Sequence, residues 1–100
     1  KKRLLVDDGV LVDLFVRLET RTAPEDIQFR FVLSLILMRK RLLRYEGVAP
    51  HAPGAGDAPE VWLMTPRGAS AAVKVINPQL TPDQISAVSQ HLSQILAEEI

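Results

Sequence analysis

The chain has 100 residues, of which 47% are hydrophobic and 24% charged, and twelve basic side chains balance twelve acidic ones. This length gives one small domain, and the neutral total gives no overall field that would attract a polyanion. The absence of cysteine excludes disulfides, thiolate zinc sites and cysteine nucleophiles, and it fits a reducing compartment, so we expect a cytoplasmic protein. Because the sequence begins at Lys1 and not at methionine, we expect a fragment, or a trimmed or partly ordered chain.

The first predicted element is an amphipathic helix from about residue 9 to residue 20. In the segment DDGVLVDLFVRLETR, apolar residues recur at spacings of one, three and four, which is typical of one helical stripe. Asp7 or Asp8 is available as the N-cap of this helix. The predicted stripe consists of Val10, Leu11, Leu14, Phe15 and Leu18.

The second predicted element is the central helix of the core, from about residue 24 to residue 41. Thr22 followed by Glu25 forms a capping-box pattern, and Pro24 lies in the first turn, where its missing N–H is harmless. The apolar positions of this helix cover more than half of its circumference, so we expect other elements to cover both sides. These positions are Ile27, Phe31, Val32, Leu35, Ile36 and Met38.

The apolar run in this helix is too short to cross a membrane. It occupies residues 31–38 and is closed by Arg30 and Arg39, whereas a spanning helix needs about 20 mainly apolar residues. Near the N-terminus, two aspartates interrupt the sequence too early for a signal peptide. We therefore expect no membrane partner.

Three strands are predicted after the central helix. Residues 43–46 alternate in polarity and favour a first strand, and the proline- and glycine-rich segment 49–59 is expected to form a mobile loop. Residues 61–64 and 71–76 then form a predicted hairpin. The intervening sequence TPRG places proline and glycine where a type I turn prefers them.

The last predicted element is an amphipathic helix that begins after Thr81. Thr81 is its predicted N-cap, Pro82 its first residue, and Gln84 closes a capping box, while Leu80 is placed to contact Ile85 across the helix start. The predicted buried stripe consists of Ile85, Val88, Leu92, Ile95 and Leu96.

Together these elements predict one α+β domain over residues 1–100. Two N-terminal helices precede an antiparallel three-stranded meander, and the C-terminal helix packs on one sheet face, because such a sheet can leave its other face in contact with water. A winged-helix-like arrangement is the alternative, since it also combines three helices with a hairpin.

No catalytic set is recognisable in the sequence. His51 lies in the predicted loop and His91 lies among polar residues of the last helix, and no pattern links either to a nucleophile. Ser34 is expected to bond a carbonyl of the preceding turn. The sequence GAGD at 54–57 lacks the flanking strand and helix that a phosphate-binding loop requires. We therefore predict no enzyme activity, no metal site and no cofactor.

The strongest candidate for a binding site is the basic cluster Arg39, Lys40, Arg41 and Arg44. In one interpretation these cations only stabilise the end of the central helix, while their stems cover apolar surface. In the other they bind an acidic partner or a nucleic acid. The neutral total and the scarcity of aromatic residues near the cluster, where Tyr45 is the only stacking platform, favour the structural interpretation.

Trp62 is the second candidate partner-binding residue. A tryptophan on a strand is most often part of a core, whereas an exposed tryptophan would mark an anchor for a partner. We predict a non-catalytic protein–protein interaction module, a subunit or adaptor of a larger assembly, that binds another chain or itself. The alternative is a nucleic-acid-binding domain that uses the basic cluster.

Four segments of the sequence carry a family resemblance: DLFVRLE, FRFVLSLILMRKRLLRYE, EVWLM and the terminal amphipathic helix. Together they resemble the C-terminal half of a family of small uncharacterised bacterial proteins, in which a short cysteine-containing part precedes such a segment. The resemblance covers most of the chain and consists of core residues. It implies a bacterial source and no activity, and it assigns no metal ligand to any residue of this sequence.

Overall fold

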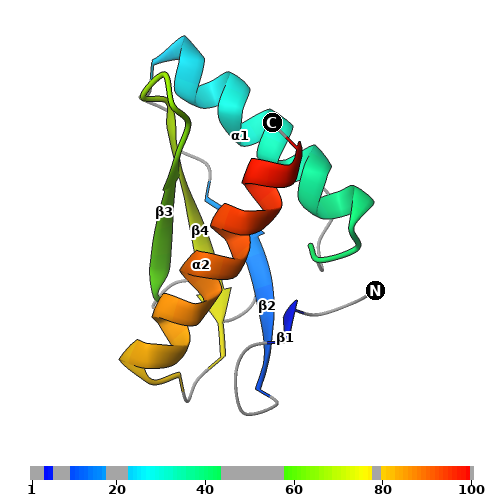
Figure 1. Cartoon of the computed structure of the whole chain (residues 1–100), viewed down its shortest axis with the longest axis vertical. Helices are drawn as coiled ribbons and strands as arrows, with labels where there is room; N and C mark the ends of the chain where they lie inside the picture. Colours follow the sequence, from blue (N-terminus) through cyan, green and yellow to red (C-terminus); the bar gives the residue numbers. More distant parts are fainter. Residues whose placement is uncertain (1–3, 6–9, 18–22, 44–57, 78–79, 100) are drawn as a thin grey trace.

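A computed structural model describes residues 4–5, 10–17, 23–43, 58–77 and 80–99 of the chain. Figure 1 shows four strands and two helices within this part. In chain order they are β1 (Leu4–Leu5), β2 (Leu11–Val16), α1 (Pro24–Arg39), β3 (Glu60–Met64), β4 (Ser70–Ile76) and α2 (Pro82–Glu99). The fold class is α+β, as predicted.

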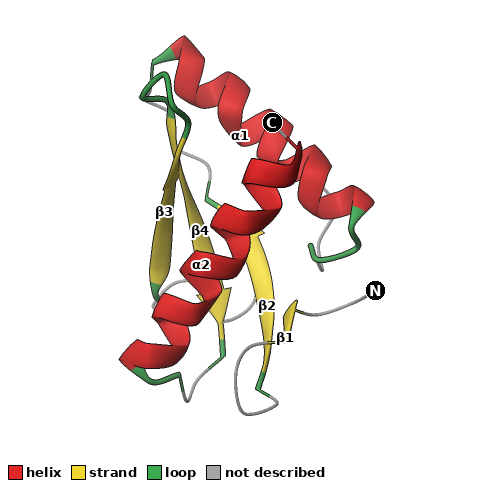
Figure 2. Ribbon diagram, viewed as in Figure 1, coloured by secondary structure: helices red, strands yellow, loops and turns green. Residues whose placement is uncertain are grey.

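The four strands form one antiparallel sheet in the order β1-β2-β4-β3. Strand β4 therefore pairs on one side with β2 and on the other with β3, and one row of the sheet aligns Val16, Val73 and Val61. Both helices lie against the same face of this sheet (Figure 2). Strands β3 and β1 form the two edges of the sheet. Because both helices lie on one face, we call that face the covered face and the other the outer face.

The core lies between the two helices and the covered face of the sheet. Along each strand, alternate residues point toward the helices, which is the period expected of a strand. The strands contribute Leu4, Val12, Leu14, Val16, Val61, Leu63, Ala71, Val73 and Val75, and the helices contribute Phe29, Leu33, Ile36, Leu37, Val88, Leu92 and Leu96. A slip of one residue would turn this apolar set outward, so its burial fixes the register of the sheet.

The predicted first helix is wrong, because residues 11–16 form strand β2. Val12, Leu14 and Val16 face the core with the period of a strand, and Phe15 is also buried, although it points to the opposite face of the sheet. A strand that is buried on both faces reads as a continuous apolar run, and such a run satisfies helical spacings by chance. Asp7, Asp8 and Leu18 lie outside the described residues.

The predicted central helix exists as α1, but most of its predicted core residues are not in the core. Only Ile36 of that set is fully buried and Met38 is partly buried, whereas Ile27, Phe31, Val32 and Leu35 are exposed. The helix is apolar on nearly every side, so the sequence pattern could not select the side that faces the sheet. The predicted capping box is also wrong, because the N-cap is Ala23, for which the described residues show no side-chain capping hydrogen bond; Thr22 lies outside the described residues.

The hairpin and the last helix are confirmed. In the β3–β4 turn, the Gly68 N–H donates to the Thr65 carbonyl at 2.9 Å, which closes the predicted four-residue turn. At the start of α2, the Gln84 N–H donates to Thr81 Oγ1 at 3.2 Å and the Thr81 N–H donates to Gln84 Oε1 at 2.9 Å. These two bonds are the reciprocal pair of a capping box.

The three-stranded meander and the winged-helix-like alternative are both wrong. The described chain runs strand, strand, helix, strand, strand, helix, and its sheet has four strands. Leu43 contributes an isolated parallel bridge to Leu14 instead of opening a described strand. The rest of the strand predicted at 43–46 and most of the loop predicted at 49–59 fall outside the described residues.

Candidate functional site

Four exposed apolar side chains lie along one side of α1, and we call this set the α1 apolar face. Its members and their exposed fractions are Ile27 at 50%, Phe31 at 64%, Val32 at 37% and Leu35 at 40%. Spacings of four residues place Ile27, Phe31 and Leu35 one above another on the helix surface. The face is therefore a continuous apolar ridge in contact with water.

The opposite side of α1 buries two polar residues. Arg30 is 3% exposed and Ser34 is also 3% exposed, and Ser34 Oγ donates to the Arg30 carbonyl at 2.8 Å, as predicted. A surface helix usually places its apolar residues toward the core and its polar residues toward water. In this helix Arg30 is buried while Phe31 is exposed. The outward side of α1 is therefore more apolar than the water-facing side of an ordinary surface helix.

Charged residues stand at both ends of the α1 apolar face. Glu25 and Asp26 lie in the first turn of α1, and Arg39 lies in the last turn. Each of these charges is opposite in sign to the partial charge of its helix end and therefore stabilises the helix. Asp26 Oδ1 also accepts the Ser70 N–H at 2.8 Å, and this bond ties the start of α1 to the β3–β4 hairpin. Glu25 and Arg39 are both exposed at the surface of the helix.

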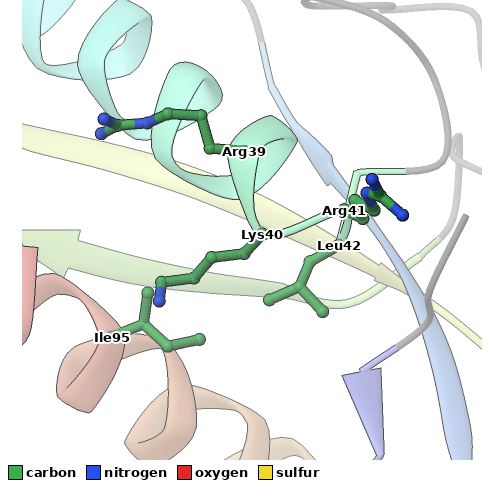
Figure 3. A pocket seen from close by; sticks show the side chains of 5 residues that line it. All are labelled: Arg39, Lys40, Arg41, Leu42 and Ile95. Atoms are coloured by element: carbon green, nitrogen blue, oxygen red, sulfur yellow. The ribbon is translucent and has the colours of Figure 1, made fainter.

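Three of the four predicted basic residues line one pocket at the end of α1. This pocket has a volume of about 460 Å³ and is bounded by Arg39, Lys40, Arg41, Leu42 and Ile95 (Figure 3). The Lys40 side chain reaches toward Ile95, whereas the side chains of Arg39 and Arg41 point away from each other. The three cations do not converge on one point, and Arg44 lies outside the described residues.

Glu99 at the end of α2 already pairs with two of these cations. Lys40 Nζ lies 3.4 Å from Glu99 Oε1, and Arg39 Nη2 lies 3.8 Å from Glu99 Oε2. These pairs join the ends of the two helices, which supports the structural interpretation of the basic cluster. Their free energy is small, because exposed ion pairs contribute roughly 0 to 1 kcal/mol.

Arg41 ends the helix in a left-handed backbone conformation, with φ 60°. The Arg41 N–H donates to the Met38 carbonyl at 2.9 Å and the Leu42 N–H donates to the Leu37 carbonyl at 2.8 Å. This pair of bonds defines a Schellman motif, in which the left-handed position is usually glycine. The partly buried Leu42 then packs against the core. The left-handed backbone of Arg41 allows the chain to turn here, although this conformation is unfavourable for a residue with a Cβ atom.

Trp62 lies on the outer face of the sheet and is 54% exposed, so it is not a core residue. The Arg17 guanidinium stands 5.4 Å from the centre of the indole ring, a cation–π distance. Arg17 Nε also donates to Glu60 Oε2 at 2.7 Å, and Lys74 Nζ lies 3.6 Å from Glu60 Oε1. The indole therefore lies against the guanidinium of Arg17, which is itself held by Glu60.

Ala72 explains how Arg17 reaches across the sheet. The Arg17 N–H donates to the Ala72 carbonyl at 2.9 Å, and Ala72 pairs with Trp62 on the next strand. Because alanine ends at Cβ, the long arginine side chain has room to cross β4, and Ala72 is only 1% exposed beneath it. Residues 17 and 60 are far apart in sequence, so no local pattern could have predicted this contact.

The predicted candidates therefore do not form one site. The basic residues end α1 on the helical side of the sheet, while Trp62 lies on the outer face. Sequence reasoning missed the α1 apolar face because it assigned those residues to the core. A usable signal was present, since one side of a helix packed on a sheet faces away from it, and apolar residues on all sides must leave some exposed.

Two general findings concern metals and membranes. Among the residues that the structure describes, no group of three or more His, Cys, Asp or Glu side chains lies together as metal ligands would. Neither α1 nor α2, the two described helices, is long and apolar enough to cross a membrane.

Comparisons with known proteins give no relative of this chain. No protein-family model, no curated protein and no solved structure matches it. The resemblance to small bacterial proteins stays a prediction, and any functional inference rests on the geometry of this chain.

Proposed function

We propose that the chain is a non-catalytic protein–protein interaction module, a subunit or adaptor of a larger assembly, that binds through the α1 apolar face. The observation that carries this proposal is the alignment of Ile27, Phe31 and Leu35 on the exposed side of one helix, with Phe31 64% exposed. Single exposed apolar residues are ordinary, but a contiguous exposed ridge is typical of an interaction surface.

The energetics support binding at this ridge. Full burial of a large apolar side chain is worth about 1.5 to 3 kcal/mol. Since the four side chains of the face are between 37% and 64% exposed, covering the rest would supply on the order of 1 kcal/mol for each. The helix backbone is already folded and anchored by Phe29, Leu33 and Leu37, so little additional ordering opposes association.

The outer sheet face is a weaker candidate. Trp62 and Met64 are exposed there, but Arg17 already covers part of the indole. A partner would have to compete with that contact and with the neighbouring Glu60 and Lys74. Met64, at 67% exposure, is therefore a suitable control position for substitutions in the α1 apolar face.

The proposal is tested with a Phe31→Glu variant expressed in place of the wild-type chain in its own cells. We expect the wild-type chain to sediment from the extract as part of a species larger than its 11.1 kDa, and the Phe31→Glu chain to be released from that species. The Met64→Glu chain should stay bound. A wild-type chain that sediments alone from the extract and also stays monomeric when it is purified and concentrated would contradict the proposal, as would a larger species unaffected by Phe31→Glu.

A further inference from the structure

We propose that the partner of the α1 apolar face is a second copy of this chain, with the two α1 helices packed antiparallel across a two-fold axis. This inference rests on the proposed function and adds the identity of the partner. It draws on the arrangement of charge along α1, which is complementary to itself when one copy is reversed.

The charges at the two ends of the face are placed symmetrically. Glu25 lies seven residues before Val32, and Arg39 lies seven residues after it, and both are exposed. Their separation is close to four turns of about 3.6 residues, so both stand on the same side of the helix. A two-fold axis near Val32 brings Glu25 opposite Arg39 of the second copy, and this contact occurs twice.

The apolar residues are also symmetric, about Phe31, which is one position before Val32. Ile27 lies four residues before Phe31, and Leu35 lies four residues after it. With the axis near Phe31 and Val32, Ile27 lies within about 1.5 Å, along the helix, of the level of Leu35 of the second copy, and the two Phe31 rings meet near the centre. The same patch serves on both copies, as a two-fold contact requires. A parallel pair would instead bring Glu25 against Glu25 and Arg39 against Arg39.

The size of the surface predicts a weak dimer. Helix α1 has 16 residues, which corresponds to a length of about 24 Å. A contact made by one such helix per copy is smaller than the roughly 800 Å² that each partner buries in a standard interface. We therefore expect the weak, reversible association that is typical of small interfaces.

The first test is sedimentation equilibrium of the purified chain over a concentration series from about 5 μM to about 1 mM, a range in which weak association becomes visible. We expect a monomer–dimer equilibrium for the wild-type chain. Phe31→Glu should weaken association by more than tenfold, because two carboxylates would face each other at the centre. Met64→Glu adds the same charge on the outer sheet face and should leave the equilibrium unchanged.

The second test separates antiparallel from parallel packing by charge reversal. Glu25→Lys alone and Arg39→Glu alone each place like charges at both ends of an antiparallel pair, and each should weaken association about five- to tenfold. The double variant restores opposite charges and should recover most of the wild-type affinity. Both reversals oppose the helix dipole, so loss of fold stability would be largest in the double variant and could not produce this recovery.

The outcomes separate this inference from the function on which it rests. A chain that stays monomeric at 1 mM, a dimer that Phe31→Glu leaves intact, or a double reversal without recovery would overturn the antiparallel self-association. If the purified chain is monomeric while Phe31→Glu still releases it from a larger species in the extract, the proposed function stands with a different protein as the partner. Failure of both experiments would overturn both.

Discussion

The two sides of α1 are both rich in apolar residues, but one side is buried and the other is exposed. Leu33 and Leu35 are two residues apart on the same helix, yet Leu33 is 1% exposed and Leu35 is 40% exposed. What separates them is the presence of the sheet and α2 on one side of the helix only. A leucine is therefore a core residue because of what packs against it, and the unmatched leucines of this helix mark a surface that another molecule would cover.

The largest expected effect separates the two sides directly. Leu33→Ala should destabilise the domain by about 2 to 5 kcal/mol, because it removes buried methyl groups and leaves a cavity. Leu35→Ala should cost less than about 1 kcal/mol, since most substitutions at exposed positions have small effects. Urea unfolding of the two variants at a concentration that keeps the chain monomeric measures the difference. Equal losses would mean that Leu35 is packed and that the α1 apolar face does not exist.

Sequence reasoning succeeded where one local signal decided the structure. The capping box of Thr81 and Gln84 and the turn ending at Gly68 depend on residues within four positions of each other, and both were predicted correctly. It failed at β2 and on the orientation of α1, because both segments are apolar on all sides. In such segments the tertiary partner selects the conformation or the buried side, and that partner is encoded elsewhere in the chain.

In the candidate site, too, some features follow from the local sequence and others depend on contacts between distant residues. That Arg39 and Lys40 serve the end of a helix was predictable from their position, because cations favour a helix C-terminus. Their pairing with Glu99 and the contact of Arg17 with Glu60 join distant parts of the sequence. The exposure of Phe31 depends on which way α1 is turned. Only the three-dimensional structure shows these features.

The outer sheet face offers a second comparison with α1, because its exposed tryptophan has a partner within the chain. We expect Arg17→Ala and Glu60→Ala each to cost about 1 kcal/mol, and the double variant to cost less than the sum by about 0.5 to 1 kcal/mol. Unfolding of the four proteins in a double-mutant cycle measures this coupling. Additive losses would show that the charges do not hold one another, and Trp62 would then be as open to a partner as Phe31.

At the C-terminal end of α1, one substitution is expected to raise the stability of the domain and not to lower it. Arg41→Gly should stabilise the domain by about 0.5 to 1 kcal/mol, because glycine adopts the left-handed conformation without the penalty that a Cβ atom brings. Lys40→Gly is the matched control, since Lys40 has the right-handed φ of −81°. It should cost about 0.5 to 1 kcal/mol. A loss of stability in Arg41→Gly would mean that the arginine side chain makes contacts that outweigh its strained backbone.

The smallest expected effect concerns the basic cluster and decides between its two interpretations. Replacing Arg39 and Lys40 with glutamine removes both pairs with Glu99, and we expect a loss of at most about 1 kcal/mol in total, because the pairs are exposed. Arg39 also takes part in the proposed dimer, so the unfolding measurement is made on the dilute monomer.

Fluorescence anisotropy with labelled DNA and RNA, at 50 and 200 mM salt, supplies the second readout. We expect weak binding for the wild-type chain and little change in the variant, because Glu99 already offsets part of the charge of these two side chains. Tight binding that falls by a factor on the order of 10² between the two salt concentrations, as counterion release from three or four phosphates predicts, and that the glutamine variant lacks, would instead make the cluster a nucleic-acid interface.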